Sequence, residues 1–216
     1  TFDLINFENS NINEKNKIAS KIDDHLKNIG FLIVTNHGIK SNVIKNISLV
    51  LNSFFNKDQK FKNKFMAPYK GYPYGYFKTE SEALAKSKGL DTPPDLKESF
   101  NGGPLKTPKG KISKDALDFC YLPTIWPDVD DFENSWKIYY NEMENLSKRL
   151  MSVFAIALKL PSDYFTKFID NPISALRALN YPLIQKEVLP KQQRAGAHTD
   201  YGSLTILLPL DSIQGL

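Results

Sequence analysis

The spacing of the apolar residues changes along this chain, and that change limits the folds it can adopt. Before residue 160 the longest patterned segments have apolar residues every three or four positions, as on one face of an α-helix. Near the C-terminal end apolar and polar residues alternate instead, as on a half-buried strand. The spacing therefore predicts helices first and sheet last, which is an α+β arrangement.

Three amphipathic helices are expected. The first ends at Gly30, a residue type that commonly follows a helix, and the second begins at Ser41. The third is the longest, and Pro161 stands just beyond its end. Their apolar faces comprise Ile18, Ile22, Leu26 and Ile29; Val43, Ile47, Val50, Leu51 and Phe54; and Trp136, Met143, Leu146, Leu150, Val153, Phe154 and Ala157.

Strands are expected in three places. Residues 31–35 form a short apolar run that predicts a buried strand, and residues 174–181 alternate as a strand should. Residues 195–210 predict two strands interrupted near Tyr201 and Gly202. The apolar row in this last segment, expected to be core, is Leu204, Ile206 and Leu208.

Two further segments are less regular. Basic residues from 57 to 70 interleave with Phe61 and Phe65, which favours a solvated helix face held by apolar anchors over a polyanion site. From 71 to 127 Gly and Pro recur among aromatic residues, so regular structure should be short there. So long an irregular stretch within a globular domain is usually functional.

Composition excludes several classes of protein. The net charge of +4 is small for 216 residues, so we do not expect a nucleic-acid partner. The longest uncharged apolar stretch, residues 203–210, is far shorter than the roughly 20 residues of a membrane-spanning helix. The lone Cys120 excludes an intramolecular disulfide and favours a reducing compartment. We therefore expect a soluble cytoplasmic protein.

The cluster with the clearest chemical meaning is His198-Thr199-Asp200. On a strand, side chains two positions apart point to the same face, so an imidazole and a carboxylate can converge on one ion. Two histidines and one carboxylate on one side of iron(II) leave positions open for substrate and dioxygen, as in non-haem iron oxygenases. The cluster supplies two of those three ligands.

The surrounding residues resemble a known family. The segments GAHTDYGSLTILL at 196–208 and IQGL at 213–216 closely resemble the core signature of the iron(II)- and 2-oxoglutarate-dependent dioxygenases. Isopenicillin N synthase-like enzymes are the nearest branch. The resemblance continues upstream through LRALNYP at 176–182, PDLKESF at 94–100 and GFLIVTNHGI at 30–39. Four blocks in the right order make the resemblance specific.

The resemblance implies a helical N-terminal region over residues 1–172, and the first strands of a double-stranded β-helix, or jelly roll, over residues 173–216. It implies that His198 and Asp200 bind iron, and that a histidine on a later strand completes the site. That histidine, and an Arg-x-Ser that grips 2-oxoglutarate, are absent, because only 16 residues follow Asp200. We therefore expect an incomplete barrel, a chain cut from a longer protein and inactive by itself.

Three more residues are candidates for the site. Tyr181 resembles the family tyrosine whose hydroxyl helps hold 2-oxoglutarate, although a buried core tyrosine is the alternative. Arg177 has two interpretations, an anion-binding residue inside the barrel or a residue at its rim. Asn101 is a candidate substrate contact. We expect no catalytic residue beyond the metal ligands.

The remaining reactive residues are expected to be structural. His25 falls on the apolar face of the first helix, where a buried or half-buried histidine is expected. His37 lies in an Asn-His-Gly turn and should hold backbone instead of metal. Cys120 has no histidine near it in sequence, so it is not expected to be a nucleophile.

The expected function is oxidation of a small molecule, by hydroxylation or a related C–H oxidation, with iron(II), 2-oxoglutarate and dioxygen. One alternative is an oxidase like isopenicillin N synthase, which does not use 2-oxoglutarate. A second is a non-catalytic binding protein that retains part of the fold. The residues do not indicate a particular substrate or an oligomeric state.

Overall fold

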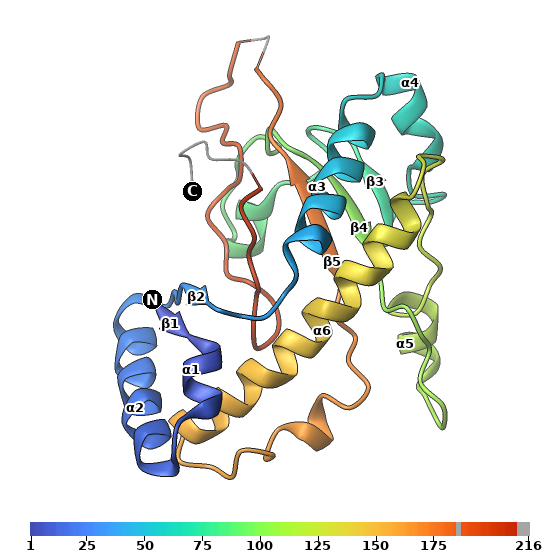
Figure 1. Ribbon diagram of the computed structural model, residues 1–216. Coiled ribbons are helices and arrows are strands. Elements are labelled where there is room, and N and C mark those ends of the chain that lie inside the picture. Colours follow the sequence, from blue (N-terminus) through green and yellow to red (C-terminus); the bar gives the residue numbers. More distant parts are fainter. Residues whose placement is uncertain (185–186, 211–216) are drawn as a thin grey trace. The chain divides into compact units, whose positions relative to one another are not determined.

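The computed structural model describes residues 1–184 and 187–210, and the residues group into two compact units (Figure 1). The first unit consists of Thr1–Lys45 and Ile138–Pro172. The second consists of Asn46–Lys137 and Ile173–Leu216. Each unit thus combines an early and a later stretch of the chain. The expected division into an N-terminal region over residues 1–172 and the start of a jelly roll over residues 173–216 stays a prediction.

The first unit is mainly helical. The first two helices begin at side-chain caps: Asp3 accepts a hydrogen bond from the Asn6 amide at 2.9 Å, and Asn11 accepts one from the Glu14 amide at 3.0 Å. Its elements are β1 (Phe2–Asp3), α1 (Leu4–Asn9), α2 (Ile12–Ile29), β2 (Val34–Thr35), the start of α3 (Ser41–Phe55), most of α6 (Phe132–Ala157) and the 3₁₀ helix η3 (Thr166–Phe168).

The three predicted helices are confirmed. Helix α2 ends at Gly30, whose φ of 79° is the left-handed conformation that glycine adopts without strain. Helix α3 begins at Ser41 and buries the apolar face that the spacing predicted. Helix α6 ends at Ala157, four residues before Pro161. Local periodicity and helix-end residues were sufficient for these three elements.

The prediction of a buried strand at 31–35 is wrong. Strand β2 contains only Val34–Thr35, which pairs in parallel with Phe2 and Asp3. Phe31 and Ile33 are 76% and 68% exposed. The run is apolar, but in the described part of the chain it pairs only with the two-residue strand β1. Phe31 and Ile33 therefore stay exposed to solvent.

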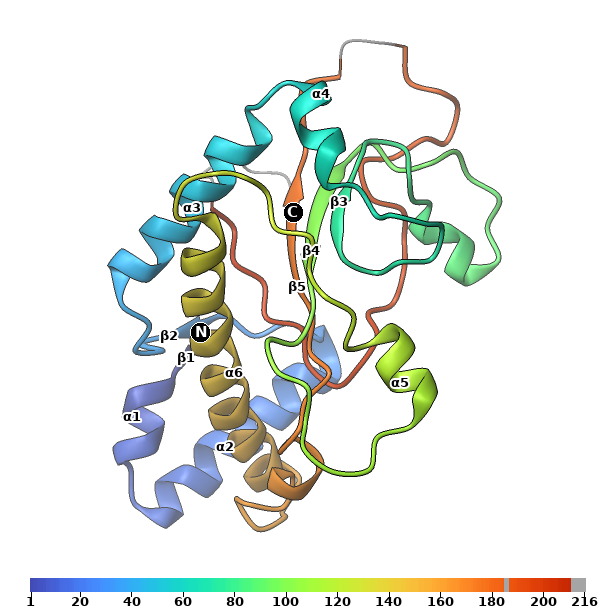
Figure 2. The same ribbon diagram turned by 90° about the vertical axis from the view of Figure 1, so that its right-hand side faces the viewer.

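The second unit contains an antiparallel three-stranded sheet with the order β3-β4-β5 (Figure 2). Strand β3 is Gly75–Phe77, β4 is Glu98–Gly102 and β5 is Leu176–Asn180. Strand β5 confirms the prediction at 174–181. The remaining elements are the rest of α3, α4 (Gln59–Lys62), η1 (Asn63–Phe65), η2 (Leu84–Lys88), α5 (Lys114–Phe119) and the start of α6. The elements between residues 71 and 127 are all short, as predicted.

The two strands predicted between 195 and 210 are not formed. This segment has no regular strand, and its apolar row is half-exposed instead of buried. Leu204, Ile206 and Leu208 do alternate with more exposed neighbours, as side chains on a strand would, but none of the three is buried in a core. A strand needs a hydrogen-bonded partner, and alternation alone does not provide one. Residues 213–216, part of the family resemblance, lie outside the described residues.

Aromatic side chains fill the core of the second unit. Phe54 makes edge-to-face contacts with Phe65, Tyr76, Phe100 and Phe132 at centroid distances between 5.6 and 6.3 Å. Trp136 lies 5.0 Å from the Phe100 ring. Such rings bury large apolar areas, and edge-to-face pairs add a favourable electrostatic term. This cluster holds α3, α6 and the sheet together within the unit.

The basic segment 57–70 is only partly the solvated face that we expected. Lys57, Lys60, Lys64 and Lys70 are exposed, but Lys62 is buried. Its ammonium group forms an ion pair with Glu98 of β4, with 2.8 Å between Nζ and Oε2. The prediction is therefore wrong for Lys62, because a carboxylate 36 positions later compensates its burial.

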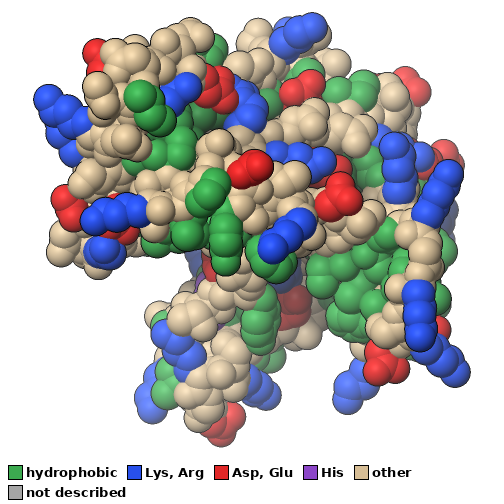
Figure 3. All heavy atoms as spheres, turned by 90° about the horizontal axis from the view of Figure 1, so that it is seen from below, with side chains coloured by type: hydrophobic (Ala, Val, Ile, Leu, Met, Phe, Trp, Pro, Cys, Tyr) green, Lys and Arg blue, Asp and Glu red, His purple; other side chains and the backbone are tan. Residues whose placement is uncertain are grey.

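The described residues have two further properties. None of the described helices is both long and apolar enough to cross a membrane. On the face shown in Figure 3, lysine and arginine side chains lie scattered among acidic, polar and apolar groups instead of forming one continuous basic patch.

Candidate metal centre

His198 and Asp200 face each other near the end of the described chain. The His198 Nε2 atom lies 3.3 Å from the Asp200 Oδ1 atom, and the side chains are 34% and 56% exposed. The two groups meet as the sequence predicted, although the segment that carries them is not a regular strand. An imidazole nitrogen and a carboxylate oxygen at this separation are donors that divalent iron accepts.

The other nitrogen of the His198 ring fixes its orientation. Nδ1 lies 2.8 Å from the carbonyl oxygen of Gly196. A carbonyl oxygen can only accept a hydrogen bond, so the proton of the neutral ring belongs on Nδ1. The lone pair is then on Nε2, the atom that faces Asp200. Metal-binding histidines usually have this arrangement, in which the second ring nitrogen donates to a carbonyl or carboxylate.

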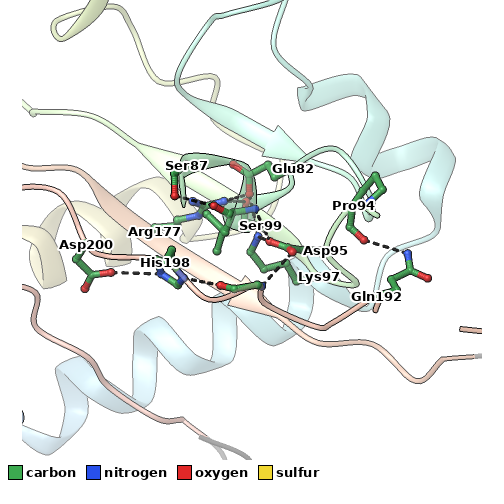
Figure 4. Close-up of polar contacts among 12 residues, drawn as sticks. Glu82, Ser87, Pro94, Asp95, Lys97, Ser99, Arg177, Gln192, His198 and Asp200 are labelled. Carbon is green, nitrogen blue, oxygen red and sulfur yellow. Dashed lines mark hydrogen bonds and ion pairs between the residues drawn. The ribbon is translucent and has the colours of Figure 1, made fainter. Parts of the chain in front are cut away.

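A cluster of acidic and basic side chains lies beside the pair (Figure 4). Asp95 Oδ1 accepts a hydrogen bond from the Gly196 amide at 3.0 Å. Asp95 Oδ2 accepts one from the Lys97 ammonium group at 3.0 Å, and that group also lies 3.2 Å from Glu82 Oε2. Sequence reasoning missed these residues as site residues. The signal was available, because Asp95 and Lys97 are charged residues inside the PDLKESF block.

Arg177 belongs to the same cluster. It projects from β5, and its Nη2 atom forms an ion pair with Glu82 and a hydrogen bond with Ser99 Oγ at 3.2 Å. Arg177 also lies opposite Asn101 in the β4–β5 register. The structure thus places Arg177 in the polar network that extends to Asp95 and, through Gly196, to His198.

Tyr181 follows β5 directly and is half-buried. Burial raises the pKa of its hydroxyl above the ordinary value, while the positive charges of Arg177 and Arg194 lower it and the negative charge of Asp95 raises it. The phenol therefore keeps its proton near neutral pH and can donate one hydrogen bond.

Asn101 lies on β4 and is also half-buried. Its Nδ2 atom donates to the Pro73 carbonyl oxygen at 3.4 Å. Its Oδ1 atom is buried, and no residue in the described part of the chain donates a hydrogen bond to it. The side chain thus retains one acceptor that is not engaged by the protein.

The other histidines do not complete a metal site. His37 Nδ1 accepts a hydrogen bond from the Ile39 amide at 3.1 Å, which confirms that this ring holds backbone. His25 is exposed, so its predicted burial is wrong; it lies toward the solvent side of α2, where Ile29 is also 60% exposed. Residues 1–184 and 187–210 contain no group of three metal-binding side chains. Cys120 is a free, half-buried thiol.

Comparison with known proteins identifies the family. Residues 2–129 match the family described as the N-terminal region of non-haem dioxygenases in morphine synthesis. This match covers more than half of the chain, and the chain belongs to the non-haem dioxygenases. The predicted resemblance is confirmed.

Curated relatives and solved structures agree. The chain is 31% identical over 196 residues to the proline hydroxylase buaE of Petromyces alliaceus, a match that covers 88% of this chain and 57% of the relative. It is 27% identical to the 2-oxoglutarate-dependent dioxygenase htyE of Aspergillus rugulosus, over 100% of this chain and 65% of that protein.

Among solved structures, a full-length protein of Neurospora crassa in complex with alpha-KG is 25% identical with a TM-score of 0.75, over 94% of this chain and 61% of that one. The chain thus spans about three fifths of the length of the proteins it matches.

Proposed function

We propose that this chain is part of an iron(II)- and 2-oxoglutarate-dependent dioxygenase that oxidises a C–H bond of a small molecule, with hydroxylation as the simplest outcome. The observation that carries the proposal is the His198–Asp200 pair. Its two donors lie 3.3 Å apart, and the Nδ1 bond to Gly196 leaves the Nε2 lone pair facing the carboxylate. The names of the two curated relatives, a proline hydroxylase and a 2-oxoglutarate-dependent dioxygenase, support the same reaction class.

The fold extends the proposal. We assign residues 1–172 to the N-terminal dioxygenase region and residues 173–216 to the start of the jelly roll, which these residues leave incomplete. The third iron ligand is then a histidine outside the 216 residues. The length of the relatives, of which this chain matches 57% and 65%, supports that assignment.

In this proposal each site residue has one task. His198 and Asp200 hold the iron, and the hydroxyl of Tyr181 donates a hydrogen bond to 2-oxoglutarate. Arg177 orients an anionic group near that hydroxyl, and Asn101 contacts the substrate. Iron(II) with 2-oxoglutarate supplies the activation of dioxygen that no protein side chain can provide.

The proposal is tested by iron(II) binding to the full-length protein. Replacing Asp200 with Ala removes one of the ligands, so the affinity for iron(II) should fall more than tenfold in anaerobic titration calorimetry. The matched control is Asp91→Ala, which removes an exposed carboxylate elsewhere in the second unit and should leave the affinity unchanged. Equal iron(II) affinity of wild type and Asp200→Ala would refute the metal assignment.

The same protein separates the alternatives. Release of succinate from 2-oxoglutarate supports the dioxygenase. Iron binding with oxygen consumption but without 2-oxoglutarate turnover would indicate an oxidase of the isopenicillin N synthase type. A protein that binds neither iron nor 2-oxoglutarate would be a binding protein that retains the fold.

A further inference from the structure

The segment that carries His198 is held in place without strand pairing. Three hydrogen bonds tie the residues just before it to residues 94–96. The Leu96 amide donates to the Gln193 carbonyl oxygen at 2.9 Å, and Gln192 Nε2 donates to the Pro94 carbonyl oxygen at 3.0 Å. The third bond is the one from the Gly196 amide to Asp95 Oδ1. It is the one nearest to His198 in the chain.

Asp95 is built to hold that amide. The residue is 2% exposed, and both of its carboxylate oxygens are engaged. Oδ1 accepts from Gly196, whereas Oδ2 accepts from the Leu84 amide at 3.1 Å and from the ammonium group of Lys97. A buried carboxylate is tolerated only when charges and hydrogen bonds compensate it, and Lys97 supplies the opposite charge. The acceptor is therefore fixed in position.

The approach of Gly196 to this carboxylate requires a glycine. A Cβ atom at position 196 would lie 2.9 Å from both the Cβ and the amide nitrogen of Ala85, and 3.3 Å from Asp95 Oδ1. Those distances are shorter than ordinary van der Waals contact, and the Ala85 nitrogen is backbone that cannot rotate away. The absence of a side chain is what lets the Gly196 peptide lie against η2 and Asp95.

We infer that Asp95 is a positioning residue for the metal centre. Its carboxylate holds the Gly196 peptide, and the Gly196 carbonyl oxygen accepts the Nδ1 proton of His198. This arrangement fixes the orientation of the ring, with Nδ1 directed at Gly196 and Nε2 directed at Asp200. The inference rests on the proposed function for its metal, but the arrangement of the apo ring is a separate property that can be measured by itself.

The experiment uses the full-length protein with Asp95→Ala. In metal-free wild-type protein, ¹H–¹⁵N NMR of the His198 ring should show a hydrogen-bonded proton on Nδ1. The Asp95→Ala variant should lose that signal, because the Gly196 carbonyl oxygen is no longer held. Its affinity for Mn(II), used as the probe metal, should fall by about tenfold, the lower end of the range for groups that orient a metal ligand.

Two further variants identify the cause. Gly196→Ala leaves the carboxylate intact but prevents the approach, so it should reproduce both effects. Asp91→Ala removes an exposed carboxylate of the same unit that lies outside the cluster, so the Nδ1 proton signal and the Mn(II) affinity should stay at wild-type values. Circular dichroism confirms folding of each variant, and if Asp95→Ala does not fold, Gly196→Ala decides.

Each outcome has one meaning. A wild-type Nδ1 proton signal and wild-type affinity in folded Asp95→Ala or Gly196→Ala would overturn the inference, as would equal losses in Asp91→Ala. Loss of the Nδ1 proton signal in a protein whose wild type binds no Mn(II) would support the positioning of His198 by Asp95 and refute the proposed metal function instead.

Discussion

The Nζ atom of Lys62 lies 2.8 Å from the Oε2 atom of Glu98, and both side chains are buried. The carboxylate also accepts hydrogen bonds from the Tyr76 hydroxyl and from Asn180 Nδ2, the latter at 2.8 Å. Lys62 donates in addition to the Phe55 carbonyl oxygen at 3.1 Å. The pair thus joins α4 to all three strands of the sheet.

Removing one partner of this pair should be costly. In Lys62→Met the Glu98 carboxylate stays buried without its opposite charge, so the free energy of unfolding should fall by about 3–5 kcal/mol. Urea denaturation followed by tryptophan fluorescence measures the change, because Trp136 is fully buried in the same unit.

Two controls separate the pair from a general effect of lost charge. Lys60→Met removes an exposed lysine of the same helix and should change the free energy by no more than about 0.5 kcal/mol. The double variant Lys62→Met/Glu98→Gln carries no unpaired charge and should recover part of the loss. A double variant less stable than Lys62→Met alone would contradict this account of the pair.

The aromatic cluster offers a second prediction. Phe54 is fully buried and contacts five other rings, so Phe54→Ala should lower the free energy of unfolding by about 3–5 kcal/mol through lost contacts and the cavity left behind. Phe119→Ala is the matched control, because Phe119 lies in the same unit and is 55% exposed. Equal losses in the two variants would show that the cluster does not form the core.

The helices could be predicted from sequence because their causes are local. The apolar spacing of residues 136–157, the glycine at 30 and the proline at 161 act within a few positions of the helices they define. The pairing of Lys62 with Glu98, by contrast, joins residues 36 positions apart, and no local pattern indicates it.

The site, too, could be predicted only where its residues are close together in sequence. The types and spacing of His198 and Asp200 suggested a metal, and the structure brings them together. Asp95 lies 101 positions before Gly196, so its role depends on tertiary folding. The predicted strands at 195–210 failed for a related reason, because strand pairing also depends on partners distant in sequence.

A third prediction concerns Gly75, at the start of β3. Its φ is 107°, and a Cβ atom there would lie 2.7 Å from the Phe65 carbonyl oxygen. Gly75→Ala therefore adds a steric clash to the strain of the backbone conformation. Gly110 has a φ of 114° with no atom near its Cβ position, so Gly110→Ala carries the strain alone.

We expect Gly75→Ala to be less stable than Gly110→Ala by about 1–3 kcal/mol, the usual cost of overpacking. Thermal unfolding of both variants measures the difference. If the two variants were equally stable, the backbone around Phe65 would be able to shift away from the added Cβ atom without loss of stability.

A fourth prediction concerns the pH dependence of stability. Arg149 Nε donates to Glu8 Oε1 at 2.7 Å, and this bond lowers the pKa of the Glu8 carboxyl below its ordinary value. Because the folded state binds the proton less readily than the unfolded state, the pair stabilises the fold above the ordinary pKa. That contribution is lost as the pH falls through the lowered value.

The difference in unfolding free energy between wild type and Glu8→Gln should therefore be largest near neutral pH, and it should shrink as the pH falls below the ordinary pKa of a glutamate carboxyl toward the lowered value. Both side chains are about one third exposed, so the difference should not exceed about 1 kcal/mol, and high salt should reduce it. Denaturant titrations across this range test it. A difference that grows as the pH falls would have the wrong sign.

Tyr181 provides the last prediction, which concerns the co-substrate. Its hydroxyl keeps its proton because burial raises its pKa, and it lies within electrostatic range of Arg177 and Asp95. Tyr181→Phe removes only the hydroxyl oxygen, so packing is retained while one hydrogen bond donor is lost.

In the full-length protein, Tyr181→Phe should weaken 2-oxoglutarate binding by about five- to tenfold, the equivalent of one neutral hydrogen bond, while iron(II) affinity stays unchanged. Titration calorimetry with each ligand separates the two effects. The control is Tyr201→Phe, because Tyr201 is 91% exposed and its hydroxyl is free to bind water. If Tyr181→Phe binds 2-oxoglutarate as tightly as wild type does, Tyr181 is a structural tyrosine, and the polar cluster around Arg177 must bind the co-substrate without it.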